Sequence, residues 1–338
     1  MFVLPLICAL APPAVPSVPR AWDVATSAQF VAAASRIGRL GGTIRLAPGD
    51  YTLRKPLVFR NTNHIVLAGS GWNTTIRMEA ASDALTFQDC AFCFVRDVLI
   101  DGGGKAASGI VFRGKGSSSN TVDQCRISSF AVSGIRFEGD PASPQSSNTV
   151  SRCHLIGNMK EQLYSRYNND FYIIRNQFGT HGKFPEVGAY LINSSAGSYT
   201  LNYHWGNGVA FRMAAGSHFN RIENNRFENS RAEGVILGGE APWACMLTVF
   251  SGNTVHTNSE GAPGKHAAMT ATNVHDCTFT SNQVFSWDTN HVKHLHSLVI
   301  GAGCRNWIVK DNIMRHNEGP SLVFQEAAGH IVKDNLVD

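Results

Sequence analysis

Charge is scarce in this sequence, and no stretch of it is strongly basic or acidic. Only 16% of the 338 residues are charged, and the formal net charge is +4. Such a composition argues against a disordered polyelectrolyte and against long, highly charged helices. Because the chain also has no run of lysine or arginine, we expect no nucleic-acid partner.

Long apolar segments are also missing, apart from the amino-terminal run MFVLPLICALAPPAVPS. This run is too short to span a bilayer. It resembles the apolar part of a secretory signal followed by small residues, although no basic residue precedes it. We therefore expect a signal peptide or disordered segment over residues 1–20 and a single domain over 21–338. The protein is then secreted or periplasmic and has no membrane partner.

No set of metal ligands is complete in the sequence. Cys90 and Cys93 form one C-x-x-C pair, and no second pair is present to build a zinc site. No compact group of aspartate and glutamate is present for calcium either. The sequence therefore predicts no definite cofactor, and it leaves both a Ca²⁺ requirement and the oligomeric state open.

What the sequence does contain is a repeat. The frame apolar-x-x-Asn-x-apolar, as in IENNRF (222–227), recurs from Asp97 to Asn335 at steps of 23 to 30 residues. A second frame follows each copy and consists of a small residue and alternating apolar residues, as in GVIL (234–237). Two short strands per period, with no helical pattern between them, predict a solenoid of stacked β-rungs.

Equivalent residues of such a solenoid form columns, because each rung lies about 4.8 Å above the previous one. Inward asparagines in one column can hydrogen-bond to one another along the stack, which satisfies their buried amides. Cys125 and Cys153 share this column, and we expect them to stack as small apolar residues rather than to form a disulfide. The asparagines assigned to the column are Asn176, Asn225, Asn253, Asn312 and Asn335.

The first rung of a solenoid needs a cover, and TSAQFVAAASRI (26–37) predicts a capping helix. Thr26 and Gln29 fit a capping box. The expected apolar stripe of this helix consists of Phe30, Val31, Ala34 and Ile37. GGTIRLAPGDYTL (41–53) then predicts a strand, a turn and a strand.

These segments, together with the asparagine column, resemble the right-handed parallel β-helix, or pectin-lyase-like, superfamily over roughly residues 22–338. The resemblance implies an all-β, right-handed parallel β-helix solenoid of about 11 rungs with an N-terminal capping helix. It also implies a polysaccharide or oligosaccharide partner. The reaction stays undetermined, because members include polysaccharide lyases, glycoside hydrolases, uronate epimerases, fructan-processing transferases and phage tailspike depolymerases.

Catalytic motifs of the better-known families are absent. The sequence lacks the paired aspartates and Gly-His-Gly of polygalacturonases, the Asp-Pro-His of mannuronan epimerases and the Trp-Ile-Asp-His of pectate lyases. Calcium is common among the lyase relatives, but no motif here identifies a ligand set. Candidate site residues must therefore come from the columns that the rungs create.

Arginine and tyrosine are concentrated at the outward positions of the second frame. The inward positions are taken as Ile110, Ile135, Leu163, Val209 and Val235. The interpretation is either a solvated, salt-bridged wall or a track for an anionic glycan, since arginine pairs with carboxylates and tyrosine stacks on sugar rings. The residues outward of the strand or just after it are Arg113, Arg136, Glu138, Tyr164, Arg166, Tyr190 and Arg212.

The turn that precedes the second frame is another candidate surface. Its inserts are the longest in the chain and hold 6 of the 13 histidines. Long inserts along one edge of a solenoid are typical of a binding face. The candidates in this row are Lys160, Glu161, Glu186, Trp205, Arg231, Glu233, Lys265, His266, His294 and His296.

Two mechanisms fit these residues. β-Elimination on a uronate needs cations for the carboxylate and groups that move protons. The expected cations are Arg136, Lys160, Arg166 and Arg212, and the expected proton carriers are Tyr164, His204 and His266. Glycoside hydrolysis needs two carboxylates, and the rung spacing puts Glu161 and Glu186 roughly 5 Å apart, and Glu186 and Glu233 roughly 10 Å apart.

We favour a lyase that acts on an acidic glycan, because basic and aromatic residues outnumber well-placed carboxylates in the middle rungs. A glycoside hydrolase or glycan transferase is the second hypothesis. A non-catalytic glycan-binding protein, such as an adhesin or a tailspike-like shaft, is the third.

Overall fold

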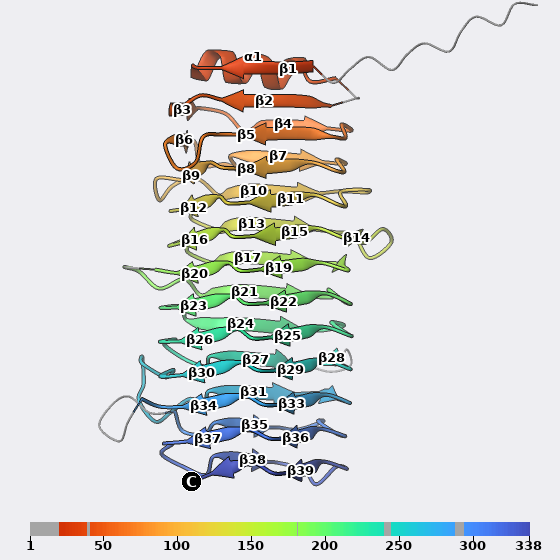
Figure 1. The fold of residues 1–338 in the computed structure, drawn as a ribbon, viewed down its shortest axis with the longest axis vertical. Coiled ribbons are helices and arrows are strands. Elements are labelled where there is room, and N and C mark those ends of the chain that lie inside the picture. Colours follow the sequence, from red (N-terminus) through yellow and green to blue (C-terminus); the bar gives the residue numbers. More distant parts are fainter. Residues whose placement is uncertain (1–19, 39–40, 181, 240–244, 288–293) are drawn as a thin grey trace, which may run out of the picture.

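The chain winds into a right-handed parallel β-helix of about 12 turns (Figure 1). The computed structural model describes residues 20–38, 41–180, 182–239, 245–287 and 294–338. Each full turn contributes three short strands, and equivalent strands pair in parallel to form three long sheets. The prediction of two strands per period was therefore wrong in one respect: the first frame contains two strands, which a tight corner separates.

The three sheets are numbered here in the order in which a turn visits them. Sheet 1 contains β1 (Arg20–Val24), β2 (Gly42–Leu46), β5 (Ile65–Ala68), β8 (Phe94–Arg96), β11 (Thr121–Asp123), β15 (Thr149–Ser151), β19 (Tyr172–Ile174), β22 (Ser198–Thr200), β25 (Arg221–Glu223), β29 (Val249–Ser251), β33 (Thr278–Thr280), β36 (Ile308–Lys310) and β39 (Ile331–Lys333). Sheet 2 contains β3 (Gly49–Leu53), β6 (Thr74–Met78), β9 (Leu99–Asp101), β12 (Arg126–Ser128), β16 (His154–Ile156), β20 (Gln177–Gly179), β23 (Tyr203–Trp205), β26 (Arg226–Glu228), β30 (Thr254–His256), β34 (Gln283–Phe285), β37 (Ile313–Arg315) and β40 (Leu336–Val337). Sheet 3 contains β4 (Leu57–Arg60), β7 (Leu85–Gln88), β10 (Ser108–Arg113), β13 (Ser133–Glu138), β17 (Glu161–Arg166), β21 (Val187–Ile192), β24 (Val209–Ala214), β27 (Val235–Gly238), β31 (Met269–Thr272), β35 (Leu298–Ile300) and β38 (Leu322–Phe324). Two short pairs lie outside the sheets: β14 (Gln145–Ser146) with β18 (Asn168–Asn169), and β28 (Cys245–Met246) with β32 (Val274–His275).

The corner between sheets 1 and 2 holds the predicted asparagine column. One residue of the corner has a left-handed backbone, as Asn224 does with a φ of 55°, and the next residue, Asn225, is buried. Asn225 Oδ1 accepts a hydrogen bond from Asn202 Nδ2 at 3.1 Å, and Asn225 Nδ2 donates to Asn253 Oδ1 at 3.0 Å. Amide-to-amide bonds of 2.8–3.1 Å continue this ladder from Asn176 to Asn335.

Towards the amino terminus, cysteines occupy the positions of the asparagine column. Cys125 and Cys153 are free and fully buried, so the stacked-thiol prediction is confirmed. The register of β9 with β12 then puts Val98 in this column, rather than the predicted Asp97. Apolar residues suit this part of the column because it adjoins the hydrophobic core.

Inward side chains of sheet 3 form much of the core. Phe59, Phe87, Phe112 and Phe137 stack face to face, with ring centroids 4.9–5.3 Å apart. The same register pairs Ala189 with Phe211, so Phe211 points inward and Val209 belongs to an outward column. The prediction that Val209 lies inside was wrong because the apolar alternation of VAF fits two registers, and only one of them buries the large phenylalanine ring.

The helix α1 (Ser27–Arg36) covers one end of the stack (Figure 1). Thr26 is its N-cap, and the Thr26 side chain accepts a hydrogen bond from the Gln29 backbone amide at 3.3 Å. The helix buries Phe30 and Ala33, whereas Val31, which was predicted to lie in the buried stripe, is exposed. A stripe at positions 30 and 33 therefore faces the first turn, and the opposite side of the helix faces outward.

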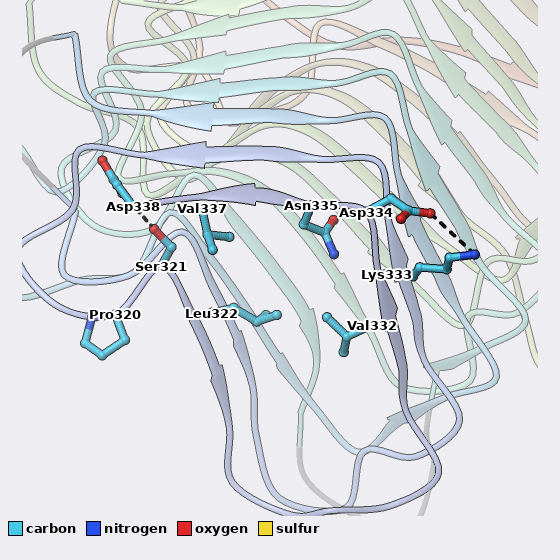
Figure 2. A pocket seen from close by; sticks show the side chains of 9 residues that line it. All are labelled: Pro320, Ser321, Leu322, Val332, Lys333, Asp334, Asn335, Val337 and Asp338. Carbon is cyan, nitrogen blue, oxygen red and sulfur yellow. Dashed lines mark hydrogen bonds and ion pairs between the residues drawn. The ribbon is translucent and has the colours of Figure 1, made fainter.

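At the other end, the last described turn surrounds a cavity of about 390 Å³. Figure 2 shows Leu322, Val332 and Val337 directed into it, with Ser321 and Asp338 hydrogen-bonded at its edge. Across the described residues there is no helix with the length and apolar character that crossing a membrane requires.

We predict that Asn225→Ala lowers the free energy of unfolding by about 2 to 4 kcal/mol, because it removes the buried hydrogen bonds that the Asn225 side chain makes with Asn202, Asn253 and the Tyr199 backbone. Denaturant unfolding monitored by circular dichroism measures this loss. The neighbouring Asn224 is exposed and left-handed, so Asn224→Gly is the matched control and should change stability by less than about 1 kcal/mol. Equal effects of the two variants would contradict the ladder's role.

Candidate functional site

Four polar side chains stack on the outer face of sheet 3. The strand register aligns Arg136, Tyr164, Tyr190 and Arg212 on successive turns. The Arg136 guanidinium lies 4.4 Å from the Tyr164 ring centroid, and that of Arg212 lies 5.1 Å from the Tyr190 centroid. The two tyrosine rings meet edge to face at 5.8 Å. We call this Arg-Tyr-Tyr-Arg column the sheet 3 column.

Arg136 is already neutralised by the protein. Its Nε lies 2.8 Å from Glu138 Oε1, and its Nη1 lies 3.5 Å from Glu161 Oε2. Glu161 also accepts a hydrogen bond of 2.6 Å from Ser133 Oγ and is only 6% exposed at its side chain. The predicted substrate cation Arg136 and the predicted catalytic Glu161 therefore form one buried ion pair, which favours a supporting role for both.

Arg212 lies at the opposite end of the column and, unlike Arg136, is not neutralised by a carboxylate of the described protein. Among the described residues no carboxylate lies within 4.0 Å of it, and its buried Nε has no hydrogen-bond partner. Buried guanidinium nitrogens are normally satisfied, so this donor is unusual. Arg166 and Lys160, which are exposed, also lack a carboxylate partner within the described part of the chain.

Burial raises the pKa of Tyr164, and the nearby guanidinium groups of Arg166 and Arg136 offset this only in part. Tyr164 is therefore a neutral phenol at ordinary pH, which can donate a hydrogen bond or a proton. That state suits a group that protonates a leaving oxygen better than one that removes a proton.

The turn row lies between the ends of sheet 2 strands and the starts of sheet 3 strands. His266 Nδ1 lies 3.4 Å from Glu233 Oε1, so the structure brings these two candidates together. The Arg231 guanidinium lies 5.2 Å from the Phe184 ring. His296 Nδ1 lies 2.8 Å from the backbone oxygen of Pro320, whereas Lys265 and Glu186 extend into solvent.

The carboxylates expected to pair for hydrolysis do not share a column. The register pairs Glu161 with Val187, so Glu186 lies one residue out of step, beside the Lys160 backbone. Glu161 pairs with Arg136 and accepts a hydrogen bond from Ser133, and Glu233 lies next to His266.

Two of the predicted site histidines lie in the core instead. His204 is fully buried, stacks on Phe178 at 4.5 Å and bonds to the Tyr199 hydroxyl at 2.5 Å. Burial lowers the pKa of His204 to about 3 and that of the equally buried His294 to about 3 as well. Neither ring can contact a glycan, so the proposed proton transfer by His204 and substrate contact by His294 are wrong.

A cluster that the sequence analysis did not single out lies at the end of sheet 2. The register stacks Gly179, Trp205, Glu228, His256 and Phe285 at one outward position. Only Trp205 was among the candidates. The signal was present in the sequence, because each of these residues follows the asparagine of its rung by three positions.

Glu228 is the centre of this cluster. It is almost fully buried, accepts a hydrogen bond from the Tyr203 hydroxyl and pairs with Arg226, and its Oε2 lies 2.7 Å from His256 Nε2. Burial alone would raise the pKa of Glu228, but the bonds from His256 and Tyr203 outweigh it and bring the pKa below its usual value. Burial and the Glu228 charge together raise the pKa of Glu260.

The described residues contain no group of three or more His, Cys, Asp or Glu side chains placed to hold a metal ion. The Cys90–Cys93 pair is buried in the core.

We predict that Arg136→Ala lowers the free energy of unfolding by about 3 to 5 kcal/mol, because it leaves the Glu161 carboxylate buried without its cation. Thermal and denaturant unfolding measure the loss. The double variant Arg136→Met with Glu161→Gln should recover most of it. A fully stable Arg136→Ala protein would show that this ion pair does not support the sheet 3 column.

We also predict that His204 makes stability sensitive to acid. The unfolded chain takes up a proton at this histidine below about pH 6.5, whereas the folded protein does not until about pH 3. Above pH 6.5 this histidine therefore does not change the free energy of unfolding. Below pH 6.5 its protonation in the unfolded chain lowers the free energy of unfolding by roughly 1.4 kcal/mol per pH unit. His204→Phe should show a shallower loss between pH 6.5 and 4.5, and parallel stability curves for the two proteins would contradict this account.

The comparisons with known proteins agree with this architecture. The family model described as "Right handed beta helix region" matches residues 108–296 and 200–338. The A-module of the mannuronan C-5 epimerase AlgE6 from Azotobacter vinelandii has a similar structure, with a TM-score of 0.67 at 13% identity, over 90% of this chain and 92% of that one. A search of curated protein sequences finds no match.

Two further solved structures are similar. The DFA-IIIase from Arthrobacter chlorophenolicus A6, solved in complex with GF2, gives a TM-score of 0.59 at 14% identity, over 85% of this chain and 83% of that one. The Dettilon tailspike protein gp208 gives a TM-score of 0.66 at 13% identity, over 90% of this chain and 63% of that one. At such low identity these likenesses show the fold, and the match of the family model over most of the sequence shows that this chain belongs to the right-handed β-helix family.

Proposed function

We propose that this protein is a polysaccharide-degrading enzyme that binds a uronate-containing glycan along the sheet 3 column and cleaves it by β-elimination. The observation that carries the proposal is Arg212, a guanidinium that lies over Tyr190 with a buried, unpartnered Nε and no carboxylate of the described protein within 4.0 Å. A uronate carboxylate is a partner that would satisfy such a group, because guanidinium and carboxylate match in charge and in bidentate geometry.

The surroundings of Arg212 suit a ring-shaped anionic ligand. The tyrosines at positions 164 and 190 lie between Arg212 and Arg136, and they present aromatic surface and hydroxyl groups to the same face. Successive rungs are about 4.8 Å apart, which is close to the length of one sugar unit in an extended chain. A glycan that follows the helix axis would therefore meet one outward side chain per sugar.

β-Elimination on a uronate removes the proton at C5, forms the C4–C5 double bond with that electron pair and breaks the bond from C4 to the leaving oxygen. In this site, Arg212 would pair with the carboxylate and stabilise the negative charge that develops there. The phenol of Tyr190, the tyrosine next to Arg212 in the column, would give its proton to the leaving oxygen. The Glu233–His266 pair is the candidate base, since Glu233 holds Nδ1 of the imidazole and leaves Nε2 to accept a proton.

The hydrolase alternative has weaker support at this surface. It requires two carboxylates on either side of a glycosidic bond, whereas Glu161 is held by Arg136 and Glu233 is held by His266. One similar structure is a mannuronan C-5 epimerase, whose name describes chemistry at the same carbon that loses its proton in β-elimination. This likeness supports a uronate polymer as the class of substrate.

We predict that incubation with a panel of alginate, pectate and glycosaminoglycans releases products that absorb in the ultraviolet as unsaturated uronates. Arg212→Ala should lower kcat/KM for the responsive glycan at least about 100-fold, and Arg212→Lys should retain more activity because it keeps the charge and loses the bidentate fork.

The matched control is Arg221→Ala, which removes an exposed arginine from sheet 1 and should leave activity unchanged. Reducing ends released without ultraviolet absorbance would favour a hydrolase or transferase over the lyase. Binding of a glycan without any product would favour a tailspike-like or adhesin-like protein that only binds.

A further inference from the structure

A group of aromatic side chains lies on the outer face of sheet 2, away from the sheet 3 column. Tyr203 and Trp205 belong to β23, Phe285 belongs to β34, and Trp287 follows two residues later. Trp287 is 62% exposed, although tryptophan is a residue that proteins usually cover. Exposed aromatic rings gathered with polar groups are typical of a ligand surface.

The Trp205 ring is held in a fixed position. A Cβ atom on Gly179, one turn earlier, would lie only 2.2 Å from the Trp205 ring, so the indole packs directly on the glycine backbone. The Tyr203 ring stacks beside it, with centroids 5.0 Å apart and planes 28° apart. These contacts orient the rings before any ligand binds, which lowers the conformational entropy that binding costs.

A second set of rings lies two turns further along the same column. The His256 and Phe285 rings are parallel, with centroids 5.2 Å apart and planes 6° apart, and the Trp287 ring lies 6.0 Å from His256. Two rungs of a parallel stack correspond to roughly 10 Å. His256 lies two rungs from Trp205, and Trp287 follows the strand of the third rung, so the span from Trp205 to Trp287 corresponds to two to three sugar units.

The polar groups between the two sets of rings balance one another in charge. Glu228 lies between Trp205 and His256 in the column and pairs with Arg226 as well as with His256. Arg226 in turn lies over the Tyr203 ring at 5.1 Å and keeps about half of its surface exposed. The cluster thus offers hydrogen-bonding groups and no free charge, in contrast to the unpaired Arg212 on sheet 3.

We propose that the sheet 2 cluster, formed by Tyr203, Trp205, Arg226, Glu228, His256 and Trp287, is a second glycan-binding site that takes an uncharged hexopyranose segment. The faces of two sugar rings stack on Trp205 and Trp287, and the hydroxyl groups between them bond to the half-exposed Arg226, which the buried Glu228 holds in place. Stacking uses the apolar C–H face of the sugar, and the balanced charge excludes a requirement for a carboxylate. This site does not depend on the proposed lyase reaction, because its residues lie on a different sheet.

Affinity electrophoresis and titration calorimetry with soluble dextran, galactan, mannan and β-glucan test this proposal. The wild-type protein should be retarded by at least one of these neutral glycans. Trp287→Ala and Trp205→Ala should each weaken that binding about 10-fold or more, the loss expected for removal of a stacking ring. Gly179→Ala offers a second route, because the added methyl group displaces the Trp205 ring without removing it.

The control variants separate this site from the sheet 3 column. Tyr172→Ala removes an exposed aromatic residue from sheet 1 and should leave neutral-glycan binding unchanged, as should Arg212→Ala. Circular dichroism and thermal unfolding confirm that each variant is folded, and Trp287→Ala, whose side chain is mostly exposed, keeps the test informative if Trp205→Ala does not fold. Absence of binding to all four glycans, or binding that survives Trp287→Ala and Gly179→Ala, would overturn the proposal. Loss of binding in Arg212→Ala alone would assign the neutral glycan to sheet 3 and overturn it too.

Discussion

Parallel pairing of successive turns is the constraint on which the rest of this structure depends. It places each residue about 4.8 Å from its equivalent in the next turn, so that every side chain is stacked on side chains of its own column. Inside, this repetition lets asparagine amides hydrogen-bond in a continuous ladder and lets phenylalanine rings stack face to face. Outside, the same repetition brings arginine to tyrosine and tryptophan to glutamate. Stability and candidate chemistry thus arise from one geometric rule.

The fold could be predicted from the sequence because its determinants are local and repeated. Asn225 and its equivalents predict a corner on almost every turn, and Thr26 and Gln29 predict the start of the covering helix. The number of strands per turn was harder to predict from the sequence. The corner consists of only two residues, so the strands on either side of it have the pattern of a single strand. Register was the other weak point, since alternating apolar residues such as VAF allow a shift of two positions without a change of pattern.

The candidate site was predictable only where a column could be aligned correctly. Arg136, Tyr164, Tyr190 and Arg212 were found because they lie in strands of equal length, without an insert inside them. What the sequence could not show is that Arg136 is neutralised by two glutamates while Arg212 is not, since ion pairing depends on side-chain directions. His204 was misassigned as an accessible group although it follows Asn202 by two positions, which is the inward place that Phe227 takes one turn later. Glu228 and His256 were missed because the row three positions after the asparagines was not aligned.

The central claim is that the positively charged end of the sheet 3 column recognises the carboxylate of an acidic glycan. A crystal structure of the protein with an acidic oligosaccharide tests it most directly. The account predicts a sugar carboxylate within hydrogen-bonding distance of the Arg212 guanidinium, with the neighbouring ring against Tyr190. An oligosaccharide bound elsewhere on the helix, with Arg212 still unpartnered, would contradict it.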